Sequence, residues 1–191
     1  AMDMVRGRSV AELITLGEVP ARRAVHIMRR VAEAVGYAHE QGVIHRDLKP
    51  ANILVDEKSG DPRVTDFGLA VLAEPDEDDK LTRTGAAVGT PAYMAPEQAR
   101  GETLDETADV YALGALLYQV LSGKPPGHAA PADLAAIEPA VPRDLIAIVA
   151  EAMARDRSNR YPRAASLVAD LERFQAGQLV GVHRYSRRQL L

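Results

Sequence analysis

Cysteine is absent from the 191-residue sequence, which excludes both a disulfide framework and a metal site with thiolate ligands. This absence fits a protein of the reducing cytoplasm. No apolar run approaches the length of about 20 residues that a membrane-spanning helix requires, and no signal peptide is visible at the start. The net charge of −4 is mildly acidic and gives no reason to expect nucleic-acid binding.

What the sequence does contain is the composition of a globular domain, with 47% hydrophobic and 26% charged residues. The length is sufficient for one domain with a sizeable core. Apolar periodicity and capping signals predict helices over residues 6–17, 20–42, 105–123, 142–154 and 162–174. The range 105–123 is apolar nearly all round, so we expect it to lie inside the domain. In the first range, Ser9 and Glu12 form a capping box.

Two short β segments, 52–56 and 63–67, lie between these helices. The turn-forming sequence EKSGDP joins them, which predicts a hairpin. Residues 68–101 show no sustained periodicity, and a loop of that length inside a compact domain is either functional or disordered. The tail, 175–191, turns basic and is expected to be peripheral.

The stretch HRDLKPANILV, residues 45–55, brings charged residues together in an order that suits phosphoryl transfer. In that reaction the protein mainly positions the acceptor hydroxyl and neutralises charge around the phosphates. Asp47 can orient the hydroxyl and take its proton, and Lys49 can reach the transferring phosphate. Asn52 and Asp66 can hold Mg²⁺, which takes oxygen ligands and is completed by phosphates and water. If the two β segments pair, Asn52 and Asp66 approach the same edge.

At these residues the chain resembles the C-terminal lobe of a protein kinase of the serine/threonine type. The catalytic-loop pattern H-R-D-L-K-x-x-N occurs at 45–52, D-F-G at 66–68, and A-P-E at 95–97. Asp109 matches the aspartate that tethers the catalytic loop, and Arg160 matches the arginine that pairs with the A-P-E glutamate. The style of the motifs resembles bacterial members of the family.

The resemblance implies a fold that is mainly α, with short β-hairpins around the catalytic loop and without the N-terminal β lobe in this chain. Asp47 is then the catalytic base, Lys49 contacts the phosphate, and Thr90 faces the substrate. The resemblance places ATP and Mg²⁺ against the hinge residues Asp3 and Val5, against Lys49 and Asn52, against Leu54 beneath the adenine ring, and against Asp66. Asn52 and Asp66 are the implied metal ligands.

Further roles follow from the same resemblance. Arg46 resembles an arginine that binds a phosphate on the activation loop, where Thr82 and Thr84 are the candidates for phosphorylation. The implied structural residues are His45 and Phe67, which stack in the family, together with Glu97, Asp109 and Arg160.

Two family motifs, G-x-G-x-x-G and V-A-I-K, do not occur in the sequence, and both belong before residue 1. We therefore expect residues 1–174 to be the C-terminal lobe of a kinase domain with part of the hinge, and 175–191 to be a basic tail that would suit a juxtamembrane stretch. Such a fragment would be inactive alone, and its exposed inter-lobe face would favour self-association. Its expected partners are ATP and a protein substrate. The alternative is a non-catalytic interaction module with a kinase fold.

Overall fold

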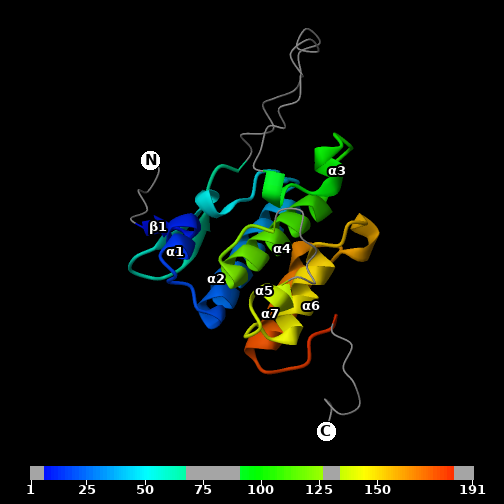
Figure 1. Ribbon diagram of the computed structural model, residues 1–191. Helices are drawn as coiled ribbons and strands as arrows, with labels where there is room; N and C mark the ends of the chain where they lie inside the picture. Colours follow the sequence, from blue (N-terminus) through cyan, green and yellow to red (C-terminus); the bar gives the residue numbers. More distant parts are fainter. Residues whose placement is uncertain (1–6, 68–90, 127–133, 183–191) are drawn as a thin grey trace, which may run out of the picture.

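The computed structural model describes residues 7–67, 91–126 and 134–182 (Figure 1). The helices are α1 (Val10–Thr15), α2 (Ala21–Glu40), α3 (Pro96–Ala99), α4 (Glu106–Ser122), α5 (Leu134–Ile137), α6 (Arg143–Ala152) and α7 (Ala164–Gln175), with short 3-10 turns η1 (Pro50–Asn52), η3 (Pro91–Tyr93) and η5 (Arg157–Asn159). The strands are β1 (Gly7–Ser9), β2 (Ile53–Asp56) and β3 (Pro62–Val64). The prediction of a mainly helical fold is confirmed.

Helix α4 forms the centre of the helical part. It packs against α2 on one side and against α6 on another, while α7 lies along α2. Its apolar residues are buried nearly all round, as the sequence predicts. Gly114 allows close contact with α6, because a Cβ at this position would lie 2.7 Å from the Cβ of Ala152.

The predicted long helix is confirmed as α2. Its buried face carries Val25, Met28, Val31 and Val35, at the spacing expected of a helix that packs one side on a core. The chain then leaves the helix at Gly42, whose φ of +75° is a left-handed conformation that glycine adopts without strain. This turn directs the next residues back towards α4.

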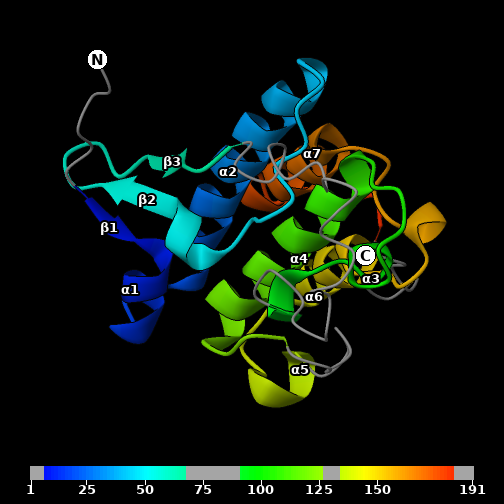
Figure 2. The ribbon, with the colours of Figure 1, turned by 90° about the horizontal axis from the view of Figure 1, so that it is seen from above.

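The β strands form a small antiparallel sheet in the order β1-β2-β3. Figures 1 and 2 show the sheet and α1 on the side of α2 and α4 that is opposite to α6. The β2–β3 hairpin confirms the predicted one, with Ile53 opposite Val64. Ile53 and Val55 point into the core, whereas Leu54 between them is half-buried on the other face of the sheet.

Two boundary predictions are wrong. Residues 7–9 form β1 rather than the start of the helix. The predicted capping box of Ser9 and Glu12 is confirmed, and it begins the helix at Val10. Gly7 is required in this strand, since a Cβ there would lie 2.2 Å from the carbonyl oxygen of Val55. The second strand of the hairpin ends at Val64 instead of continuing to residue 67.

The stretch that lacks periodicity contains η3 and α3, which are too short for a helical pattern to be detected. The predicted peripheral position of the tail is only partly correct. Val180 is 2% exposed, and the Gly181 N–H donates to Asp170 Oδ1 at 2.8 Å.

Within the described ranges, no helix has both the length and the hydrophobicity that a membrane crossing requires.

Candidate active site

Asp109, in the first turn of α4, anchors the predicted catalytic loop. Its Oδ1 accepts the Arg46 N–H at 2.9 Å, and its Oδ2 accepts the His45 N–H at 2.7 Å. The same Oδ2 lies 2.8 Å from His39 Nε2 of α2. The carboxylate is buried and has lost its hydrogen bonds to water. The three donors compensate for that loss. One side chain therefore joins α4, α2 and the loop.

His45 connects the catalytic loop to the end of the hairpin. Its Nδ1 accepts the Asp47 N–H at 3.3 Å, so the proton of the neutral ring is on Nε2, which donates to the Thr65 carbonyl oxygen at 2.9 Å. The ring centroids of His45 and Phe67 are 4.8 Å apart, at an interplanar angle of 60°. Phe67 is 38% exposed whereas His45 is 1% exposed, so this ring pair extends from the buried loop to the surface.

Asp47, Lys49 and Asn52 meet on the loop that leads into β2. The Lys49 Nζ lies 2.6 Å from Asp47 Oδ2, and the Asn52 Nδ2 donates to the Asp47 carbonyl oxygen at 2.9 Å. A longer contact of 3.4 Å joins the Asn52 amide to Asp47 Oδ2. The Asp47 side chain is 40% exposed, which leaves its carboxylate within reach of another molecule.

Asn52 and Asp66 lie at the same end of the hairpin, as the predicted pairing requires. The Thr65 N–H donates to the Asn52 carbonyl oxygen at 2.9 Å, one pair beyond Ile53 and Val64. Asp66 follows directly and is exposed. The described residues contain no group of three or more His, Asp or Glu side chains arranged for a metal. A cation here would therefore take few protein ligands and complete its shell from phosphates and water.

Two residues of this region have left-handed backbone conformations although neither is glycine. Arg46 has a φ of +67° and Asp66 a φ of +61°. Such conformations cost on the order of 1–3 kcal/mol and persist where the surroundings hold them. Arg46 directly precedes Asp47, the predicted catalytic base, and Asp66 is itself a predicted metal ligand.

The ion pair of Glu97 and Arg160 fixes the segment that contains α3. The two guanidinium nitrogens lie 2.5 and 2.8 Å from the two carboxylate oxygens, and both side chains are buried. Arg160 also donates to the carbonyl oxygens of Ala154 and Thr107 and lies 5.0 Å from the Tyr111 ring centroid. Burial is the largest single influence and acts to raise the pKa of Glu97. The hydrogen bonds from Arg160, a hydrogen bond from the Glu97 backbone and the charge of Arg160 together outweigh it and hold the pKa below its usual value.

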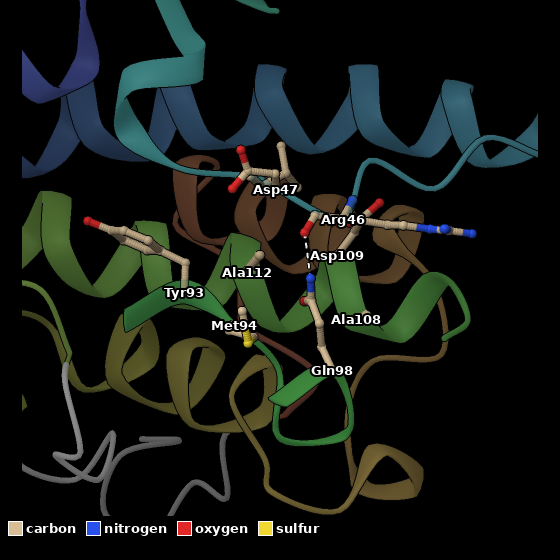
Figure 3. Close-up of a pocket in the computed structure, with 9 residues that line it drawn as sticks. Arg46, Asp47, Tyr93, Met94, Gln98, Ala108, Asp109 and Ala112 are labelled. Atoms are coloured by element: carbon tan, nitrogen blue, oxygen red, sulfur yellow. Dashed lines mark hydrogen bonds between the residues drawn. The ribbon is translucent and has the colours of Figure 1, made fainter. Parts of the chain in front are cut away.

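A small cavity of about 10 Å³, close to the space of one water molecule, lies between the loop, the α3 segment and α4 (Figure 3). From the loop, the side chains of Arg46 and Asp47 point in opposite directions. The Gln98 side chain reaches across from α3, and its Nε2 donates to the Arg46 carbonyl oxygen at 2.7 Å.

Five predicted site residues, Asp3, Val5, Thr82, Thr84 and Thr90, lie outside the described residues. Two contacts were not anticipated from the sequence, those of His39 and Gln98. The position of His39 on the apolar face of α2 indicates burial but not its partner, and the sequence holds no signal for the contact of Gln98.

Comparison with known proteins identifies the family. The protein kinase domain family matches residues 1–174. This chain belongs to the protein kinase family.

The curated relatives of this kinase chain include bacterial serine/threonine-protein kinases. The chain is 40% identical to PknB of Mycolicibacterium smegmatis and 37% identical to PknB of Mycobacterium tuberculosis, in each case over 93% of this chain and 30% of the relative. It thus spans about a third or less of the length of these relatives. The crystal structure of the Mycobacterium tuberculosis PknI kinase domain has the same fold, with a TM-score of 0.71 at 26% identity, over 91% of this chain and 64% of that one.

Proposed function

We propose that this kinase chain carries the phosphoryl-transfer residues of an ATP- and Mg²⁺-dependent protein serine/threonine kinase. The observation that carries the proposal is the arrangement at Asp47, whose carboxylate lies 2.6 Å from the Lys49 ammonium and 3.4 Å from the Asn52 amide. A carboxylate, an ammonium and an amide on one short loop can position a hydroxyl, neutralise a phosphate and bind a metal within one site.

In the proposed reaction, the hydroxyl oxygen of a protein serine or threonine bonds to the γ-phosphorus of ATP. The bond from that phosphorus to the bridging oxygen breaks, and its electron pair leaves with ADP. Asp47 orients the hydroxyl and accepts its proton. Lys49, beside Asp47, offsets the negative charge of the transferring group.

Asn52 and Asp66 are the residues that we infer hold Mg²⁺. The amide nitrogen of Asn52 is directed to Asp47, so the amide oxygen is the atom that remains for a cation. Asp66 offers an exposed carboxylate at the same end of the hairpin. Oxygen atoms of these types suit Mg²⁺, which would neutralise the negative charge of the ATP phosphates.

The other contacts of nucleotide and substrate are proposed from family likeness. Leu54, half-buried on the outer face of β2, would lie beneath the adenine ring. Asp3 and Val5 would belong to the hinge that binds its edge, and Thr90 would contact Asp47 and Lys49 on the substrate side. His45, Phe67, Asp109 and the Glu97–Arg160 pair would have structural roles, which their contacts support.

Regulation by phosphorylation of Thr82 or Thr84 is part of the proposal. Arg46 is exposed beside Asp47, and a guanidinium forms strong paired hydrogen bonds with a phosphate. Phosphorylation would then order the activation loop against Arg46 and raise activity. In a Thr82→Ala, Thr84→Ala double variant and in Arg46→Ala, activity should fall to similar levels, and full activity in the double variant would refute this switch.

The domain boundaries and the cellular location of the protein are also proposals. Residues 1–174 would be the C-terminal lobe of the kinase domain with part of its hinge, and residues 175–191 a basic tail. An enzyme that uses ATP would work in the cytoplasm. The basic tail would suit the cytoplasmic side of a membrane anchor in the natural protein.

A non-catalytic interaction module is the alternative function. Such a module needs a stable surface but has no physical need for Asp47, Asn52 and Asp66 together. The close contact of Lys49 with Asp47 favours catalysis, because it places a cation where phosphate charge would develop.

Phosphoryl transfer by the protein at its natural length tests the proposed function. The protein is incubated with γ-labelled ATP and a basic acceptor protein, with and without Mg²⁺, and the labelled amino acids are identified. We expect label on serine or threonine only, and only with Mg²⁺. Nucleotide-independent partner binding without any transfer would instead favour the interaction module.

A further inference from the structure

Gln98 connects the segment after Ala95-Pro96-Glu97 to the catalytic loop. Its side-chain Nε2 donates to the carbonyl oxygen of Arg46 at 2.7 Å, across 52 positions of sequence (Figure 3). At that distance the bond is a well-formed one between neutral groups. The carbonyl belongs to the peptide unit that joins Arg46 to Asp47, so its orientation bears directly on the proposed catalytic base.

The backbone of Arg46 is held from two sides. Its N–H donates to Asp109 Oδ1 at 2.9 Å, and its carbonyl accepts from Gln98 at 2.7 Å. Between these two bonds lies the left-handed φ of +67°, which a residue with a side chain adopts only at a cost. The contact with Asp109 fixes the peptide before this strained residue, and the contact with Gln98 fixes the peptide after it.

The reach of Gln98 is itself fixed by its neighbour. Glu97 is anchored through its two hydrogen bonds to the buried Arg160 guanidinium. Gln98 follows in α3 and is half-buried, so its side chain starts from a backbone that cannot shift freely. The ion pair thereby sets the position from which the amide contacts the loop.

We propose that Gln98 is a positioning residue for phosphoryl transfer, which orients the Arg46–Asp47 peptide and so the Asp47 carboxylate. This inference rests on the proposed function. The hydrogen bond of Gln98 also links the α3 segment directly to the catalytic loop. A displacement of the α3 segment would therefore displace the Arg46–Asp47 peptide.

The test compares two substitutions at position 98 in the natural-length protein. Gln98→Met keeps the length of the side chain but removes the donor, whereas Gln98→Lys keeps a donor. Gln175→Met is the control, because Gln175 is exposed at the end of α7. The readouts are kcat, the KM for ATP, the thermal midpoint and the carbonyl carbon chemical shift of Arg46.

Because one hydrogen bond that positions the Arg46–Asp47 peptide is lost, we expect Gln98→Met to lower kcat roughly three- to tenfold. The KM for ATP should stay at the wild-type value, the thermal midpoint should fall by no more than a few degrees, and the Arg46 carbonyl signal should shift. Gln98→Lys should recover most of kcat, and Gln175→Met should match the wild type.

The inference is overturned if Gln98→Met retains the wild-type kcat, if Gln98→Lys is as impaired as Gln98→Met, or if the loss of activity follows a fall in the thermal midpoint. Inactivity of the wild-type protein would refute the proposed function instead. In that case an unshifted Arg46 carbonyl signal in Gln98→Met would still overturn the contact, and a shifted one would support it.

Discussion

Asp109 shows how much of this site depends on single side chains. Its carboxylate receives contacts from two backbone N–H groups and from His39, and it is buried in the first turn of the central helix. A buried carboxylate with these donors is far more costly to remove than an exposed one, since the donors would then be left without acceptors. The predicted catalytic loop is thus held by its backbone, which leaves the Asp47 and Lys49 side chains available for the proposed chemistry.

The Asp66→Ala substitution tests the proposed metal ligand. We expect it to weaken Mg²⁺-dependent nucleotide binding of the natural-length protein at least about tenfold, because an anionic oxygen ligand is lost from a site with few protein ligands. Titration calorimetry with and without Mg²⁺ measures this difference. Asp61→Ala, in the exposed turn of the hairpin, is the matched control. Equal dependence on Mg²⁺ in wild type and Asp66→Ala would argue against the assignment.

At the scale of elements, the Glu97–Arg160 pair joins α3 to the turn before α7. Both side chains are buried, and removal of one partner leaves the other as an uncompensated charge. Arg160 also bonds to three carbonyl oxygens, at Ala154, Arg155 and Thr107, so its position does not depend on Glu97 alone. Substitution of Glu97 should therefore destabilise the protein without displacing the turn.

The pH dependence of this pair follows from the lowered pKa of Glu97. A carboxyl whose folded pKa is depressed contributes stability that is fully present above its unfolded value, about 4.3. That stability is lost as the pH falls below this value and through the lower folded pKa. The ion pair should thus be intact at neutral pH and weaken only in acid.

Glu97→Gln should accordingly lower the free energy of unfolding by about 3–5 kcal/mol at pH 7, as expected when a buried pair loses one charge. The difference from wild type should shrink as the pH falls below about 4.3. Urea unfolding at a series of pH values measures both effects. Glu102→Gln, at an exposed ion pair, is the control and should stay near wild type. A difference that grows in acid would contradict the assigned charge state.

The long elements of the fold could be predicted from the sequence, whereas several short ones could not. The apolar face of α2 and the apolar surface of α4 span many turns, so their patterns are strong. By contrast, β1 has three residues and α3 has four, which is too few to show a period. The pairing of β1 with β2 depends on residues far along the chain. The burial of Val180 in the core also depends on residues that are distant in sequence.

The candidate site shows the same division. The residues of H-R-D-L-K-x-x-N and D-F-G could be identified from motifs, and the hairpin confirms that Asn52 and Asp66 share an edge. The contacts of His39 and Gln98 could not be predicted from the sequence, because each joins residues that lie more than 50 positions apart. Such contacts arise only when the packing of α2, α3 and α4 brings the segments together.

At the scale of the whole molecule, the site lies where the small sheet meets the helices (Figure 2). Leu54 is half-buried on the face of the sheet that points away from the core. The 191 residues contain neither G-x-G-x-x-G nor V-A-I-K, the motifs that bind the nucleotide phosphates from the opposite side in the family. We therefore expect the 191 residues by themselves to offer only part of the contacts that ATP requires.

We predict that the purified 191-residue chain binds ATP weakly and transfers no phosphate, while the natural-length protein does both. The chain should also associate with itself through the outer face of the sheet around the half-buried Leu54. Calorimetry, autophosphorylation and sedimentation of the two proteins under the same conditions make the comparison. Robust autophosphorylation by the shorter chain would refute this expectation.

The most direct measurement is the rate of phosphoryl transfer by the Asp47→Asn variant of the natural-length protein. Asn keeps the size of the side chain but cannot accept the hydroxyl proton, so kcat should fall at least about 100-fold. Circular dichroism and the thermal midpoint should match the wild type, because Asp47 is partly exposed and does not belong to the core. Asp61→Asn, at an exposed carboxylate outside the site, should retain full activity. Turnover of Asp47→Asn within a few-fold of wild type would contradict the assignment of Asp47 as the catalytic base.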